Sequence, residues 1–156
     1  MELEDLKTEY GKLAKKYVIP AFKEINEAFE VDRIERKTEC ILREVRKTMM
    51  EKIVGYIRFL EMMINPSQAP PMFMIFVKSL LENDRKTIEK VYKNFIELEL
   101  KSLKLEIDYS EKAEAEAIKN ILKVWDETRN DLKTTIGIME RNWSSSENKK
   151  DKGYFG

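Results

Sequence analysis

The chain has 156 residues, of which 42% are hydrophobic and 37% are charged. This balance is too apolar for a disordered protein and too charged for a membrane protein, and the length suits one domain. Basic and acidic residues number 29 each, so no net charge attracts the chain to nucleic acid or anionic lipid.

The residues that the chain lacks exclude several chemistries. Histidine is absent, which rules out Ser-His-Asp and Cys-His nucleophile pairs, histidine-ligated zinc or haem, and Glu-x-x-His di-iron sites. Cys40 is the single cysteine, so no disulfide forms within the chain. The sequence opens without a signal-peptide pattern, which predicts a cytoplasmic location. Scarce glutamine among many charges is typical of thermophiles. We expect no cofactor and no catalytic residues.

The first predicted helix begins near the N-terminus and continues past Pro20. Its apolar residues recur every three or four positions, which places them on one helical face. Proline removes a helical hydrogen bond and clashes with the preceding turn, so we expect a kink near Pro20. The members of the face are Leu3, Leu6, Tyr10, Leu13, Tyr17, Phe22, Ile25 and Phe29.

The start of the second helix has two readings. Asp32 can serve as the N-cap of a helix, and Glu35 supplies a carboxylate three residues later, as in a capping box. This pattern favours a turn near Val31 and Asp32. The alternative is one continuous helix from Pro20 to Ile64. In both readings the helix ends at Asn65-Pro66, because proline disfavours a helical conformation in the preceding residue.

Two further helices follow the loop formed by residues 65–71. The third helix is predicted from Met72 to about Asp108, and the fourth from Glu111 to Trp143, with Ser110 at its N-terminus. Some positions in their apolar faces are polar, and such residues usually fix the register of packed helices through hydrogen bonds. They are Asp84, Ser102, Thr128 and Thr135.

Four helices with short connections predict an all-α fold. The arrangement expected is an antiparallel up-down-up-down four-helix bundle with long helices. Residues 1–143 would form the single domain, and residues 144–156 a short polar C-terminal tail. No stretch is apolar enough over about 20 residues to span a membrane.

A methionine-rich region at one bundle end is the first candidate site. Its apolar residues surround most of the helix circumference, and methionine suits surfaces that adapt to another body. We therefore predict a protein-partner interface there, through which a homo-oligomer or a small subunit associates. The alternatives are an ordinary core filled by methionines and an apolar ligand pocket. The residues are Met49, Met50, Tyr56, Phe59, Met62, Met63, Met72, Phe73, Met74 and Phe76.

A basic ridge on the second helix is the second candidate site. Helical spacing places five basic side chains on one side, where they would bind phosphates or another anion. A nucleic-acid-associated accessory protein is thus an alternative function, although aromatic residues that stack on bases are missing from the ridge. An ordinary solvated face is the other interpretation. The five residues are Arg33, Arg36, Lys37, Arg43 and Lys47.

Spaced carboxylates give a second alternative function. Glu24 and Glu27, together with Glu127 and Asp131, form a pattern that resembles the Glu-x-x-Glu plus acidic pair of all-α nucleotide pyrophosphohydrolases. Such carboxylates would hold Mg²⁺ against a triphosphate. The second pair is spaced by four residues instead of three, and glutamate is common enough in this chain for chance matches. The leading expectation therefore remains a non-enzymatic protein without a metal.

Overall fold

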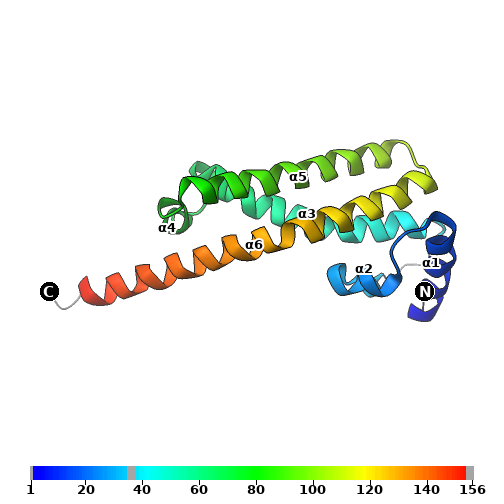
Figure 1. Cartoon of the computed structure of the whole chain (residues 1–156), viewed down its shortest axis with the longest axis horizontal. Coiled ribbons are helices and arrows are strands. Elements are labelled where there is room, and N and C mark those ends of the chain that lie inside the picture. Colours follow the sequence, from blue (N-terminus) through cyan, green and yellow to red (C-terminus); the bar gives the residue numbers. More distant parts are fainter. Residues whose placement is uncertain (1, 35–37, 154–156) are drawn as a thin grey trace. The chain divides into compact units, whose positions relative to one another are not determined.

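The chain is all-α in the computed structural model, which describes residues 2–34 and 38–153, and side chains as far as residue 148. Within these residues no strand occurs. Figure 1 follows the elements from the N-terminus in blue to the C-terminus in red. The helices are α1 (Leu3–Tyr17), α2 (Phe22–Phe29), α3 (Ile41–Ile64), α4 (Phe73–Lys78), α5 (Glu82–Ile107) and α6 (Glu111–Gly153), with short 3-10 helices η1 (Val31–Arg33) and η2 (Pro66–Gln68).

Two compact units make up the chain. Unit 1 contains Met1–Gly55 and Phe95–Asp126, and unit 2 contains Tyr56–Asn94 and Glu127–Gly156. Helices α3, α5 and α6 each contribute residues to both units. Each unit buries its own apolar residues, so we describe them one after the other.

In unit 1 two separate helices flank Pro20, so the single helix with a kink near Pro20 that the sequence predicted is not found. Helix α1 ends at Val18, whose φ of 53° and ψ of 51° are left-handed, and α2 starts at Phe22. A β-branched residue rarely adopts this conformation, and a hydrogen bond from Ile19 N to Ala14 O closes the helix end there. The Tyr10 hydroxyl donates to Pro20 O at 2.9 Å, so the break is tied to the core.

A second break separates α2 from α3. Glu30 is left-handed with φ 54°, η1 follows it, and α3 begins at Ile41. The side chain of Asn26 accepts a hydrogen bond from Asp32 N at 2.8 Å, which stabilises the turn. The predicted turn near Val31 and Asp32 is confirmed, and the continuous helix from Pro20 to Ile64 is wrong.

An aromatic cluster joins α2 to the rest of unit 1. Phe29 is buried, and its ring centroid lies 5.6 Å from that of Trp125 in α6. Lys52 from α3 places its Nζ 4.8 Å from the Trp125 ring centroid and donates to Ala28 O at 2.6 Å. Three helices therefore meet around the Phe29 side chain.

Unit 2 contains a helix break that the sequence did not predict. The third predicted helix is divided into α4 and α5, and the carboxylate of Asp84 accepts a hydrogen bond from Leu81 N at 2.9 Å at the start of α5. Asn142 Nδ2 in α6 donates to Phe76 O in α4 at 3.3 Å. The unit buries Ile57, Leu60, Met63, Val77, Leu80, Ile88, Val91, Leu132 and Met139.

Helix α6 begins where the sequence predicted but extends beyond Trp143. The Ser110 hydroxyl accepts a hydrogen bond from Ala113 N at 3.3 Å, as expected of an N-cap. The helix continues to Gly153, so the predicted tail is helical from Ser144 to that residue. Residues 144–148 are exposed or half-buried, in keeping with their polar composition.

Candidate interaction site

A buried ion pair in unit 1 connects α3 with α6. Arg46 is 1% exposed, and Glu114 is completely buried. Arg46 Nε donates to Glu114 Oε2 at 2.5 Å, and Nη2 donates to Oε1 at 3.3 Å. This two-point contact between a guanidinium and a carboxylate is both strong and directional.

Helix α5 contributes the remaining partners of the pair. Arg46 donates from Nη1 to the Ser102 hydroxyl and from Nη2 to the Glu106 carboxylate. Arg43 stands one turn away, with its Nε 3.5 Å from Glu114 Oε1 and its guanidinium 4.7 Å from the Tyr109 ring centroid. We call Arg43, Arg46, Ser102, Glu106 and Glu114 the buried network.

The buried network keeps its charges because the partners compensate for lost hydration. Burial works against the charged form of Arg46, but hydrogen bonds to Glu114 and Glu106 outweigh it and raise the pKa of Arg46 above its usual value. Among the side chains that the structure describes, no buried nitrogen or oxygen lacks a hydrogen-bond partner. The network therefore holds three helices in fixed relative positions within unit 1.

Acid should weaken the buried network through Glu106. The hydrogen bond from Arg46 holds the pKa of Glu106 below its ordinary 4.5 in the folded chain. A lowered carboxyl pKa contributes stability that is present above pH 4.5 and is lost as the pH falls through the folded value. We expect the urea concentration at the unfolding midpoint to decrease as the pH is lowered below 4.5. This decrease should be less steep in Glu106→Gln. Equal slopes in the two proteins would contradict this prediction.

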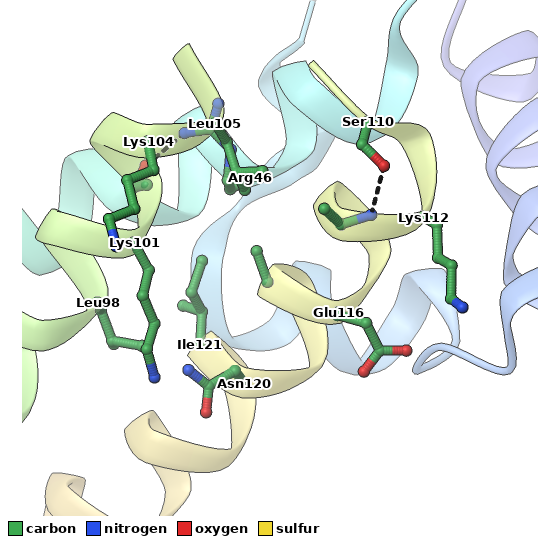
Figure 2. Close-up of a pocket in the computed structure, with 13 residues that line it drawn as sticks. Arg46, Leu98, Lys101, Lys104, Leu105, Ser110, Lys112, Glu116, Asn120 and Ile121 are labelled. Atoms are coloured by element: carbon green, nitrogen blue, oxygen red, sulfur yellow. Dashed lines mark hydrogen bonds between the residues drawn. The ribbon is translucent and has the colours of Figure 1, made fainter. Parts of the chain in front are cut away.

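A groove of about 690 Å³ lies beside the buried network, between α5 and α6 of unit 1. Figure 2 shows Leu98, Leu105 and Ile121 on its walls and Arg46 between the helices. Alanines line the α6 side at positions 113 and 117, where a larger side chain would fill the space. The groove is therefore open because large residues on α5 face small ones on α6.

Positive charge surrounds this apolar groove. Lys101 and Lys104 extend from α5, and Lys112 extends from α6 (Figure 2). In the part of the chain that the structure describes, no carboxylate forms an ion pair with any of these three lysines. The acidic residue at the groove, Glu116, is paired with Lys119 at 2.9 Å. A ligand in the groove thus meets apolar walls and a basic rim.

The residues of the methionine-rich region differ widely in exposure. Three of them lie in the interior, namely Met49, Met50 and Met63, which are at most 5% exposed. The exposed members are Met72 at 52% and Met74 at 37%, both in unit 2. The other residues of the methionine-rich region are half-buried, namely Tyr56, Phe59, Met62, Phe73 and Phe76.

The described members of the predicted basic ridge do not share one helix face. Helix α3 begins at Ile41, so Arg33 belongs to η1, where it pairs with Glu51 at 2.8 Å. Arg43 belongs to the buried network, and Lys47 lies 3.6 Å from Glu106. Two further members, Arg36 and Lys37, lie outside the described residues.

The four candidate magnesium ligands have other partners. Glu24 accepts a hydrogen bond from Ala21 N at 2.8 Å, and Glu27 lies 3.8 Å from Lys23. Asp131 lies 3.6 Å from Lys90 in unit 2, which also contains Glu127. The described residues hold no group of three or more acidic or thiol side chains placed to bind a metal ion.

Sequence analysis missed Arg46 and Glu114, although a usable signal exists. Arg46 follows Leu42 by four residues, and Glu114 precedes Ile118 by four, so both charges occupy apolar positions of their helices. The same criterion did identify Ser102, which accepts a hydrogen bond from Arg46. Opposite charges at such positions on two helices predict a buried ion pair.

Comparison with known proteins gave no relative. No protein-family model, curated protein or solved structure matched this chain. In the described residues, no helix combines the length and the apolar content needed to cross a bilayer.

Proposed function

We propose that this protein works by association, binding an amphipathic helix of an acidic partner in the groove between α5 and α6. The observation that carries the proposal is an apolar groove whose rim lysines Lys101, Lys104 and Lys112 have no acidic partner in the described residues. Apolar walls select the apolar face of a helix, and the lysines select carboxylates along its flanks.

The shape of the groove supports a helical occupant. Helices α5 and α6 are joined by a short turn, so they run antiparallel beside the groove within unit 1. A third helix packs into such a space when small residues permit its close approach, and Ala113 and Ala117 supply them. The side chains of Leu98 and Ile121 are buried, so a bound helix would contact only their few exposed atoms.

The buried network supports the proposal because it preorganises the groove. Arg46 lines the groove and donates hydrogen bonds to Ser102 in α5 and to Glu114 in α6. Fixing both walls before binding lowers the entropy that association costs. The proposal retains the antiparallel four-helix bundle, the cytoplasmic location and the non-enzymatic role that the sequence predicts. It places the principal contact at the groove between α5 and α6 instead of the methionine-rich region.

A designed peptide tests this function. The probe is a fluorescein-labelled helix with leucines at positions i, i+3, i+4 and i+7 and glutamates on both flanks, compared with the same helix carrying lysines. We expect the acidic helix to bind more tightly, and Lys101→Glu/Lys112→Glu to weaken it about tenfold by removing attraction at the rim. Fluorescence anisotropy at increasing salt measures both effects.

Two variants separate the groove from general charge effects. Ala117→Leu fills the groove without changing charge and should weaken the acidic helix at least tenfold. Lys93→Glu/Lys86→Glu alters net charge equally but lies in unit 2, away from the groove, and should leave affinity within about twofold. If the acidic and basic helices bind alike, or if Ala117→Leu has no effect, the proposal is wrong.

A further inference from the structure

Helix α5 carries a second apolar face that nothing in unit 1 covers. Leu100 is 56% exposed, Leu103 is 54% and Ile107 is 81%. Ile96, half-buried, continues the face toward the middle of the helix. The four positions are separated by four, three and four residues, so they form one line along α5, which we call the outer stripe.

The outer stripe is distinct from the buried face of the same helix. Phe95, Leu98 and Ser102 point into the interior of unit 1, and the outer stripe lies on the other side of α5. Isolated exposed leucines are common on protein surfaces, but a line that keeps the coiled-coil spacing over two heptads is not. This spacing is that of the a and d positions at which two helices interlock.

The charges beside the outer stripe differ between its two flanks. With Leu100 and Ile107 at a positions and Ile96 and Leu103 at d positions, Glu99 occupies a g position and Lys104 an e position. Both side chains reach solvent at least in part, and in the described residues neither forms an ion pair. The g flank therefore carries Glu99 and Glu106, and the e flank carries Glu97 and Lys104.

This arrangement of charge determines which partner fits. In a parallel pair of helices, a g residue meets the e residue five positions later on the other helix, so Glu99 of each copy meets Lys104 of its partner copy. In an antiparallel pair, g faces g and e faces e, so Glu99 would meet Glu106 in a repulsive contact that offsets the attraction between Glu97 and Lys104. The complement of the outer stripe is thus the same stripe in parallel orientation.

We infer that two copies of this chain associate in parallel through the outer stripes of α5, with two symmetric Glu99–Lys104 ion pairs flanking the contact. The interface holds four apolar residues from each copy, which is at the small end for specific association. The dimer is therefore transient and depends on protein concentration. Its apolar contact uses a face of α5 other than the groove wall, and Lys104 is the one residue that it shares with the groove rim, so Leu103→Gln distinguishes the dimer from the proposed partner helix.

Sedimentation velocity of the full chain over a wide concentration range tests the dimer. We expect a monomer–dimer equilibrium whose dissociation constant rises at least tenfold in Leu103→Gln. Glu99→Lys should raise it about five- to tenfold, because two attractive contacts become repulsive. Mixing Glu99→Lys with Lys104→Glu should restore association, because each g residue then meets an opposite charge at e.

The charge variants also test the orientation. In an antiparallel dimer, Glu99→Lys would place lysine against Glu106 and strengthen association, which would overturn the parallel arrangement. Leu81→Gln is the matched control, since Leu81 is 72% exposed but belongs to unit 2, and it should leave the constant unchanged. A chain that stays monomeric at the highest concentration, or a dimer insensitive to Leu103→Gln, would overturn the inference.

Discussion

Replacing Arg46 by methionine is expected to lower the free energy of unfolding by about 3–5 kcal/mol. The change leaves the carboxylate of Glu114 completely buried, with Arg43 3.5 Å away as the remaining cation. Ser102 and Glu106 lose a hydrogen bond each. Urea unfolding followed by circular dichroism measures the loss.

Two companion variants show whether burial causes this loss. Arg33→Met removes an ion pair with Glu51 whose side chains are 51% and 68% exposed, and should cost under about 1 kcal/mol. The double variant Arg46→Met/Glu114→Leu removes both buried charges and should recover to within about 2 kcal/mol of the original chain. If the double variant is as unstable as Arg46→Met, the loss comes from packing and not from an unpaired charge.

Truncation of Phe29 to alanine is the second large effect, with an expected loss of about 3–5 kcal/mol. The ring is 1% exposed and contacts Trp125, so its removal leaves a cavity where three helices of unit 1 meet. Lys52 loses one of its two aromatic neighbours. We expect α2 to detach more easily and Trp125 to become hydrated.

Tryptophan fluorescence measures this change within unit 1. In a Trp143→Phe background Trp125 is the remaining tryptophan, and its emission should shift to longer wavelength in Phe29→Ala. Phe22→Ala is the matched control on the same helix, because Phe22 is half-buried against Tyr10 at a ring distance of 5.7 Å. The role of Phe29 would be contradicted if Phe29→Ala lowered the free energy of unfolding no more than Phe22→Ala does and left the Trp125 emission unchanged.

Hydrophobic periodicity predicted that the chain is helical, and the capping residue Ser110 predicted the N-terminus of α6, because both signals depend on local sequence. Ser110 caps α6, and the turn near Asp32 occurs where a polar residue offers a local hydrogen bond. Helix ends set by backbone strain left no such signal. Val18 and Glu30 are left-handed although neither is glycine, so nothing in the sequence marked them.

The candidate site could be predicted in part only, because its properties depend on which helices meet. The basic ridge assumed that Arg33 and Lys47 share a helix, and the later start of α3 removes that assumption. Burial of Met49 and Met63 depends on side chains distant in sequence. The outer stripe of α5 was not predicted from the sequence, because its exposure follows from the packing of the opposite face of the helix.

The ion pair between Arg46 and Glu114 also limits how the helices of unit 1 can slide. A slip of α6 by one turn, about 5.4 Å, would separate the two charges and leave both in apolar surroundings. Interdigitated leucines alone permit such a slip, because one leucine can replace another. The pair therefore penalises every misaligned packing of α3 and α6 and leaves one alignment satisfied.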